Sequence, residues 1–176
     1  MADFQELLVD APPLAIPKHH QFRKSWRWPH AVESFFALRI EDKYSLHVCC
    51  GQSEVGNERI DLDPNSKRTQ EGDMRNIPFP NNTFDVVFGD WPWKMNFYKR
   101  FRPFYEMARV CKVGGSVIIN AIWIPHSEVM LQREIFVRCD SPFGTASVIL
   151  VYEKLADFLD KPYDHCVSMD TSQEVN

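Results

Sequence analysis

The stretch Phe84–Trp93, FDVVFGDWPW in one-letter code, constrains the fold more than any other part of this sequence. Its first part is mostly apolar and predicts a short buried strand over Phe84–Gly89. The strand stops at an acid that is followed by two indoles and a proline, Asp90, Trp91, Pro92 and Trp93. Ligands of open α/β sheets bind at the carboxyl ends of the strands. We therefore expect a carboxylate and a flat aromatic surface at a ligand-binding edge, a site suited to a planar group that bears an amine.

The composition is that of one globular domain. The chain has 176 residues, of which 44% are hydrophobic, enough for a substantial core. No apolar run approaches the roughly 20 residues of a membrane-spanning helix, and the acidic N-terminus does not resemble a secretory signal. The five cysteines are odd in number and include no CxxC spacing, so neither a disulfide framework nor a metal site is expected. The prediction is a reduced, cytoplasmic protein.

The net charge of −4 is unevenly distributed along the chain. The segment Leu155–Asn176 is acidic, whereas Lys18–Trp28 and Lys94–Lys112 are basic and rich in aromatic residues. Such segments can contact phosphates and stack on bases, although solvated charge with core aromatics is an equally good explanation. The residues predicted to contact nucleic acid are Arg23, Lys24, Arg27, Trp28, Lys94, Lys99 and Arg100.

Strands alternate with helices along most of the chain. Helices are predicted over Pro29–Arg39, where proline suits the first turn, and over Arg100–Cys111, where apolar residues recur with helical spacing until Gly114-Gly115. A further short helix is expected near Ser127–Gln132. The predicted strands are Ser45–Cys50, Arg59–Asp63, Thr69–Gly72, Phe84–Gly89, Ser116–Trp123, Ile135–Cys139 and Ala146–Tyr152.

The last two strands are joined by a turn with proline and glycine, which is typical of a hairpin. The alternation followed by a hairpin predicts an α/β fold with a mainly parallel sheet, helices on both faces and an antiparallel C-terminal strand pair. Eight residues, Gly51–Glu58, separate the first two strands, fewer than the dozen or so of an ordinary parallel crossover. Either an extended loop or an unusual strand pairing is therefore expected there.

Three polar sites follow the ends of successive strands. Gly51 can let a ligand approach the backbone closely, although it can also simply turn the chain. Asp61 and Asp63 end the second strand, where an acid can hold ribose hydroxyls; Asp63 before a proline is equally a turn former. Asp73 can accept a hydrogen bond from an adenine amine, with Met74 against the ring, or it can cap a loop.

The order of these sites resembles that of class I S-adenosylmethionine-dependent methyltransferases. Gly72–Met74 leading to Phe84–Val87 is similar to the acid and Phe-Asp-x-Val elements of that family, and Arg109–Gly115 is similar to the segment before its fifth strand. The resemblance covers about Leu46–Tyr152 and implies a Rossmann-like fold with S-adenosylmethionine as cofactor. The cofactor-binding residues that it implies are Cys50, Gly51, Gln52, Ser53, Asp61, Asp63, Asp73 and Met74, with Asp61 preferred to Asp63 for the ribose.

Asp90-Trp91-Pro92-Trp93 is similar to the Asp-Pro-Pro-Tyr/Trp box of methyltransferases that modify an exocyclic amine of adenine or cytosine. By that resemblance, Asp90 and the Pro92 carbonyl would accept the hydrogens of the amine, and Trp93 or Trp91 would stack on an extruded base. The alternative is that both indoles are core residues. In this sequence Trp91 stands where the family most often has proline.

The resulting prediction is an S-adenosylmethionine-dependent N-methyltransferase that acts on a nucleobase amine, adenine first, in DNA or RNA. Two alternatives remain, a small-molecule methyltransferase and a methyltransferase-like binding subunit without catalysis. The predicted organisation is an N-terminal basic and aromatic extension (1–28), the methyltransferase domain (29–154) and an acidic tail (155–176). Because no target-recognition domain fits in this length, a partner subunit could supply target selection.

Overall fold

The computed structural model describes residues 28–64, 67–90, 101–138 and 146–157. These residues form two helices, α1 (His30–Arg39) and α2 (Phe101–Val110). They also form the strands β1 (Ser45–Val48), β2 (Glu58–Asp61), β3 (Gln70–Glu71), β4 (Phe84–Gly89), β5 (Cys111–Ala121), β6 (Met130–Arg138) and β7 (Ser147–Lys154). The predicted first helix and the predicted strand Phe84–Gly89 are confirmed.

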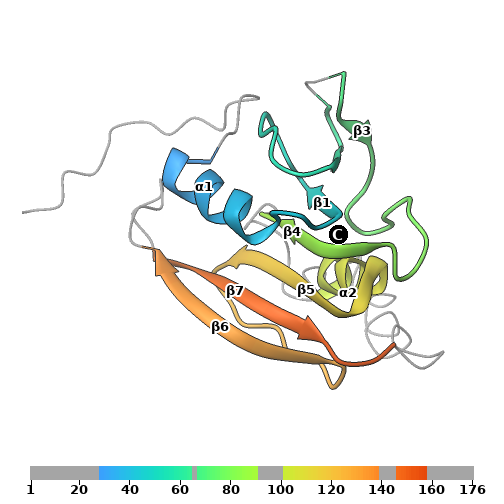
Figure 1. Ribbon diagram of the computed structural model, residues 1–176, viewed down its shortest axis with the longest axis vertical. Helices are drawn as coiled ribbons and strands as arrows, with labels where there is room; N and C mark the ends of the chain where they lie inside the picture. The colour runs from blue at the N-terminus through green and yellow to red at the C-terminus, as the bar shows by residue number, and fades with distance from the viewer. Residues whose placement is uncertain (1–27, 65–66, 91–100, 139–145, 158–176) are drawn as a thin grey trace, which may run out of the picture.

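All the strands join one sheet in the order β3-β2-β1-β4-β5-β7-β6. The neighbours from β3 to β5 are parallel, whereas β7 runs antiparallel between β5 and β6. The predicted fold class, a Rossmann-like and mainly parallel sheet with an antiparallel C-terminal hairpin, is confirmed. Figure 1 shows β6 as the outer strand on the side of the sheet away from β3.

An extended loop, rather than a helix, connects β1 to β2. The two strands pair in parallel in the ordinary way, with Val48 opposite Ile60. The backbone turns through left-handed conformations at Cys49 (φ 57°), Gly51 (φ 54°) and Gly56 (φ 108°), which are costly for residues with a Cβ but not for glycine. Of the two alternatives left open by the short connection, the extended loop is the one that forms.

The sheet is covered on both faces. On one, the α1 face, α1 packs on side chains of β4, β5 and β7. The buried members of this cluster are Trp28, Val32, Phe36, Val86, Phe88, Ile118, Ile149 and Val151. On the other, the α2 face, Phe104 and Met107 of α2 join a larger cluster with Leu46, Val87 and Ile119. Because neighbouring residues of β4 belong to different clusters, the helices lie on opposite faces (Figure 1).

The helix predicted near Ser127–Gln132 is wrong, because β6 begins at Met130. Buried or half-buried positions alternate with exposed ones from Met130 to Arg138, which is the period of a strand. Leu131 and Ile135 are on the more exposed side of the strand. The full alternation becomes visible only when the pattern is followed to Arg138.

The sequence also placed the end of α2 too late. The helix ends at Val110, and Cys111 already belongs to β5, so Gly114-Gly115 does not stop the helix. The pairing of β4 with β5 shifts between Phe84 and Val86. A Cβ on Gly115 would lie 2.7 Å from the Asp85 carbonyl oxygen, so glycine allows the strands to meet at this irregularity.

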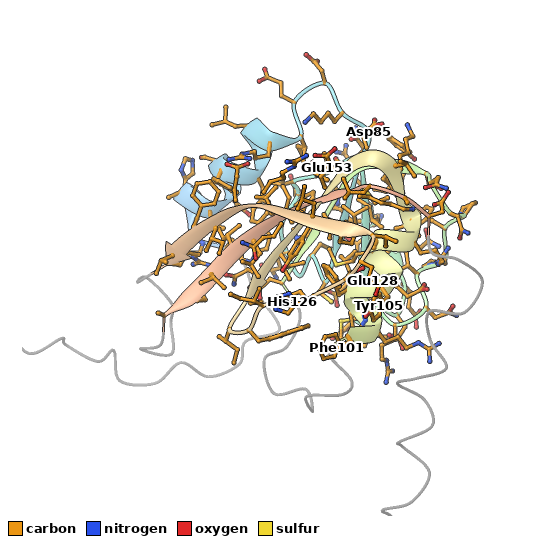
Figure 2. The ribbon with its side chains drawn as sticks, turned by 90° about the horizontal axis from the view of Figure 1, so that it is seen from below. Asp85, Phe101, Tyr105, His126, Glu128 and Glu153 are labelled. Carbon is orange, nitrogen blue, oxygen red and sulfur yellow. The ribbon has the colours of Figure 1, made fainter. Side chains whose placement is uncertain are left out.

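Lys112, near the start of β5, pairs with a residue of β4. Its Nζ donates a 2.8 Å hydrogen bond to Asp85 at the start of β4, the residue labelled in Figure 2. The Tyr44 backbone N–H donates to the second oxygen of the same carboxylate. These contacts, led by Lys112, lower the pKa of Asp85. The pair therefore ties β5 to the amino end of β4.

Residues 73–83, here called the β3–β4 loop, are bonded to α2. The Arg109 guanidinium donates to the carbonyl oxygens of Ile77 and Phe79, each at 2.8 Å, and pairs with Glu106. Glu106 in turn accepts the Ile77 N–H at 2.9 Å. Near the start of the helix, Arg102 donates to the Arg75 carbonyl at 2.8 Å. We call these contacts the α2 clasp; they hold the loop along the helix.

Within the described residues, neither helix has the length and apolar character needed to cross a membrane.

Candidate active site

Three of the predicted site carboxylates come together at the carboxyl edge of the sheet. Asp61 ends β2, Asp73 follows β3 and Asp90 follows β4. All three act electrostatically on the thiol of Cys49, which follows β1. Burial, and then these negative charges, raise the pKa of Cys49 well above its usual value. The three acids therefore lie at one edge of the sheet.

Asp61 is oriented by the backbone on both sides. Its Oδ2 accepts the Gly51 N–H at 2.9 Å, and its Oδ1 accepts the Asp63 N–H at 3.0 Å. Each carboxylate oxygen can accept a further hydrogen bond, so this arrangement can also receive two vicinal hydroxyls. Asp63 is exposed and contributes its backbone N–H, which is consistent with the preference for Asp61.

Asp73 is paired with a residue that the sequence analysis did not single out. Arg75 donates from Nε to both carboxylate oxygens at 3.0 Å and from its terminal nitrogen at 2.6 Å. The hydrogen bonds from Arg75 lower the pKa of Asp73. Both side chains are partly exposed. An adenine amine at Asp73 would therefore share the carboxylate with Arg75.

The remaining residues predicted to bind the cofactor differ in accessibility. Gln52 is exposed and Gly51 half-buried, so both can meet a ligand. Cys50 and Ser53 are buried, and the Ser53 N–H donates to the Cys50 carbonyl at 2.9 Å, which shapes the loop. Met74 is also buried, with its sulfur 3.3 Å from Cys49 Sγ. The Met74 side chain therefore packs against Cys49 beneath the site.

Asp90 directly follows a close approach of β4 to β1 at Gly89. A Cβ on Gly89 would lie 2.6 Å from the Val48 carbonyl oxygen, so only glycine permits this approach of the two strand ends. Asp90 is half-buried, and its Oδ2 accepts a 3.1 Å hydrogen bond from Trp28 Nε1. The indole thus fixes the direction of the carboxylate from a position 62 residues earlier in the chain.

That contact corrects the prediction for Trp28. The side chain is only 4% exposed, its ring lies 4.1 Å from Phe36 and 4.9 Å from His47, and it belongs to the core of the α1 face. Because Phe36 and His47 already lie against the ring, it is not available to stack on a base. The other predicted nucleic-acid and acceptor residues lie outside the described residues: Arg23, Lys24, Arg27, Trp91, Pro92, Trp93, Lys94, Lys99 and Arg100.

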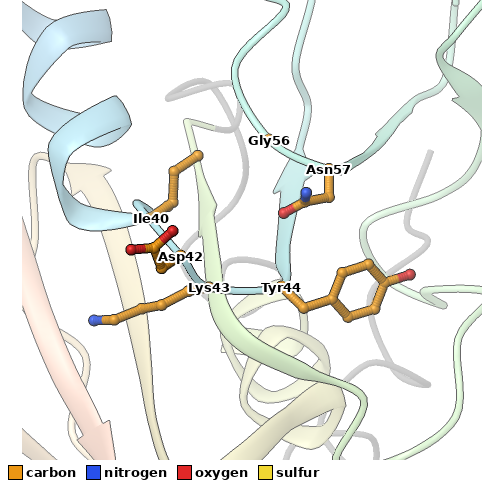
Figure 3. Close-up of a pocket in the computed structure, with 6 residues that line it drawn as sticks. All are labelled: Ile40, Asp42, Lys43, Tyr44, Gly56 and Asn57. Atoms are coloured by element: carbon orange, nitrogen blue, oxygen red, sulfur yellow. The ribbon is translucent and has the colours of Figure 1, made fainter.

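A pocket of about 580 Å³ lies elsewhere, at the amino end of β1 (Figure 3). Tyr44 and Lys43 line it together with Gly56 and Asn57. The amino edge of a parallel sheet is opposite the edge at which ligands of such folds bind. The pocket is therefore separate from the three carboxylates. The described residues also include no group of three or more side chains that could hold a metal ion.

The carboxyl edge fits S-adenosylmethionine chemically. The cofactor carries a sulfonium cation, and carboxylates at short range stabilise positive charge. Asp61 offers oriented acceptors at the end of β2, the position at which related folds hold a ribose. Asp73 is a carboxylate after β3, with a lowered pKa that keeps it ionised. Gly51 and Gln52 can meet the rest of the molecule from the β1–β2 loop.

Residues 33–119, which extend from α1 to β5, match the family described as "Methyltransferase domain". No curated protein matches the sequence.

Several solved structures share the fold. The 1,6-didemethyltoxoflavin-N1-methyltransferase of Burkholderia thailandensis, solved with 1,6-didemethyltoxoflavin and S-adenosylhomocysteine, has a TM-score of 0.59 and 7% identity over 72% of this chain and 78% of that one. The N-methyltransferase NodS of Bradyrhizobium japonicum WM9 has a TM-score of 0.52 and 9% identity over 72% and 96%. The [4+2]-cyclase SpnF has a TM-score of 0.53 and 12% identity over 77% and 85%.

Because the last of these proteins is a cyclase, the fold by itself does not determine the reaction. The family match covers Asp61, Asp73 and Asp90 and the strands that precede them. This match and the strand order support a methyltransferase domain that uses S-adenosylmethionine as its cofactor.

Proposed function

We propose that the protein transfers a methyl group from S-adenosylmethionine to an exocyclic amine of a nucleobase, adenine first, in DNA or RNA. The observation that carries the proposal is the half-buried Asp90 carboxylate at the end of β4, oriented by Trp28 at the same edge as Asp61 and Asp73. An amine is the acceptor that such a carboxylate recognises, because it offers hydrogens to an oxygen that only accepts.

Asp90 would act on the acceptor by position. When bound, S-adenosylmethionine supplies an electrophilic methyl group. A hydrogen bond from the amine to Asp90 would hold the nitrogen with its lone pair directed at that methyl group, and positioning of this kind can supply much of the rate. As the nitrogen–carbon bond forms and the sulfur–carbon bond breaks, the nitrogen becomes positively charged. The nearby carboxylate would stabilise that charge, and a proton then leaves the nitrogen for Asp90 or water.

Replacing the carboxylate tests this role. Asp90→Ala is expected to lower methyl transfer to an adenine-containing oligonucleotide by at least about a hundredfold, while the affinity for S-adenosylhomocysteine changes little. Transfer of a radiolabelled methyl group and calorimetric titration measure the two quantities. Asp85→Asn at the opposite end of β4 is the matched control and should keep the activity. Full activity of Asp90→Ala would exclude Asp90 from the reaction.

The cofactor residues are tested separately. Asp61→Asn and Asp73→Asn should each weaken the binding of S-adenosylmethionine by roughly tenfold, because each loses a charge-assisted hydrogen bond. Calorimetric titration of the purified proteins measures the effect. A folded wild-type protein that binds neither S-adenosylmethionine nor S-adenosylhomocysteine would instead be a binding subunit without catalysis.

A small-molecule acceptor is the second candidate, and the charge of the site favours it. Asp61, Asp63, Asp73 and Asp90 make the described part of this edge acidic, which repels the phosphates of a nucleic acid. The basic residues predicted to contact phosphates, Arg23, Lys24, Arg27, Lys94, Lys99 and Arg100, lie outside the described residues. Binding of a single-stranded oligonucleotide that falls steeply with salt would support the nucleic-acid proposal. Methylation of a free amine without such binding would support the small-molecule alternative.

A further inference from the structure

The side-chain amide of Asn120, near the carboxyl end of β5, is buried without a hydrogen-bond partner among the described residues. The residue is 1% exposed, and both its amide oxygen and its amide nitrogen lack a partner among these residues. A buried amide without partners is costly. An apolar residue would fill the same position in this apolar strand more favourably. The polar atoms therefore need an explanation outside the core packing.

The register of the sheet brings Asn120 beside Asp90. β4 and β5 are parallel, with Phe88 opposite Ile118 and Gly89 opposite Ile119. Asp90 follows Gly89, and Asn120 follows Ile119, so the same register places them opposite each other. Ile118 and Phe88 both belong to the α1-face cluster, and alternation along a strand returns to the same face after two residues. Trp28 of that cluster bonds Asp90. Asp90 and Asn120 therefore lie on neighbouring strands and on the same face of the sheet, the α1 face.

We propose that Asn120 is a second acceptor-binding residue, whose amide pairs with the edge of the base that carries the methylated amine. The inference rests on the proposed function and extends it from one carboxylate to a pair of groups. Asp90 and the Asn120 oxygen would each accept one hydrogen of the amine, and the Asn120 nitrogen would donate to the ring nitrogen next to it. Asparagine commonly pairs in this two-bond way with adenine.

Asp90 and Asn120 together would determine which bases the site accepts. Adenine and cytosine both present an amine next to a ring nitrogen that accepts a hydrogen bond. An analogue without the amine would leave the buried Asn120 oxygen without a donor. Sites built to bond a polar group reject analogues that lack it much more strongly than apolar pockets reject a missing methyl group.

Other buried polar groups without partners are less suited to this role. His47 Nε2 belongs to a ring stacked on Phe88 at 4.4 Å. Ser147 Oγ lies on β7, one strand further from Asp90. Ser147 therefore provides a control, since it is also buried and without a partner among the described residues.

The test uses the full chain saturated with S-adenosylhomocysteine. The probes are two fluorescent thymidine oligonucleotides, one with a central adenine and one with purine, which lacks the amine. Fluorescence anisotropy is expected to show that the wild type prefers adenine by about tenfold or more. Asn120→Leu should lose about tenfold of that preference, Ser147→Ala should keep it, and all three should bind S-adenosylhomocysteine equally.

Each outcome of this test either supports or overturns the inference about Asn120. If Asn120→Leu keeps the wild-type preference, the inference about Asn120 is overturned and the nucleobase proposal stands. If the wild type does not distinguish the probes, both fail. If Asn120→Leu is unfolded by circular dichroism, Asn120→Ala takes its place with the same expectation. A merely structural asparagine would change the melting temperature in these variants without changing the preference between the probes.

Discussion

Each acid of the site is held by a different kind of partner. Asp61 accepts backbone N–H groups, Asp73 is paired with Arg75 and Asp90 accepts the Trp28 indole. The three carboxylates were predictable from the sequence because each stands at or just after the end of a strand. The Trp28 contact was not, because two residues so far apart in sequence are brought together only when α1 packs on the sheet.

Trp28→Phe tests the orienting contact. Phenylalanine keeps most of the packing against Phe36 but removes the N–H that Asp90 accepts, so methyl transfer should fall roughly tenfold, with little change in cofactor affinity. Single-turnover methylation measures the effect.

The double variant with Asp90→Ala provides the control. If Trp28 acts through Asp90, Trp28→Phe should cause no further loss once the carboxylate is absent. A loss of the same size in both backgrounds would show that Trp28 affects activity by another route.

At the scale of elements, the α2 clasp gives a structural reason for two segments that the family resemblance identified only by their residue patterns. The loop Ile77–Thr83 and the segment from Arg109 occur together because the Arg109 guanidinium is bonded to the carbonyls of that loop. The clasp positions Asp73 and Met74 at the start of the same loop.

Arg109→Met is therefore expected to destabilise the fold and weaken the cofactor site together. The change removes the charged partner of the buried Glu106 carboxylate and the donor of the loop carbonyls, which should lower the free energy of unfolding by about 3 kcal/mol. Urea unfolding and calorimetric titration measure the two effects. Arg133→Met is the control, because Arg133 pairs with Glu153 at the surface and should change stability by less than about 1 kcal/mol.

The elements were predictable to different degrees, for physical reasons. The strand Phe84–Gly89 was found at its true bounds because an apolar run ends at an acid. β6 was misjudged at its start because its exposed side carries apolar residues, so polarity alone does not show the alternation. The end of α2 was misplaced because Cys111 is compatible with both helix and strand, and pairing with Phe84 decides for the strand.

At the scale of the whole molecule, a neutral histidine in the core makes the fold sensitive to acid. His47 is buried between Trp28 and Phe88, and burial lowers its pKa from 6.5 to about 3 despite the contact with the Val55 carbonyl. Between these two values the unfolded chain binds a proton at this position and the folded chain does not. Stability is therefore lost as the pH falls from about 6.5 towards 3.

The expected contribution is a decrease of up to roughly 1.4 kcal/mol in the free energy of unfolding per pH unit over that range. Urea unfolding at pH 7, 6 and 5 measures it. His47→Gln should flatten the dependence, whereas His126→Gln, at an exposed position, should leave it unchanged. Equal slopes for the wild type and His47→Gln would show that other groups cause the acid sensitivity.

The α2 clasp also has a consequence for binding order. The chain enters α2 from the segment that follows Asp90, while Arg102 near the start of the helix is bonded to the carbonyl of Arg75, the partner of Asp73. An acceptor that steadies the start of α2 would thus steady Asp73 through Arg75. Coupling between two ligands is reciprocal. By this route, a ligand held by Asp73 would tighten the hold on the acceptor by the same factor, and the acceptor would stay longer on a loaded domain than on an empty one.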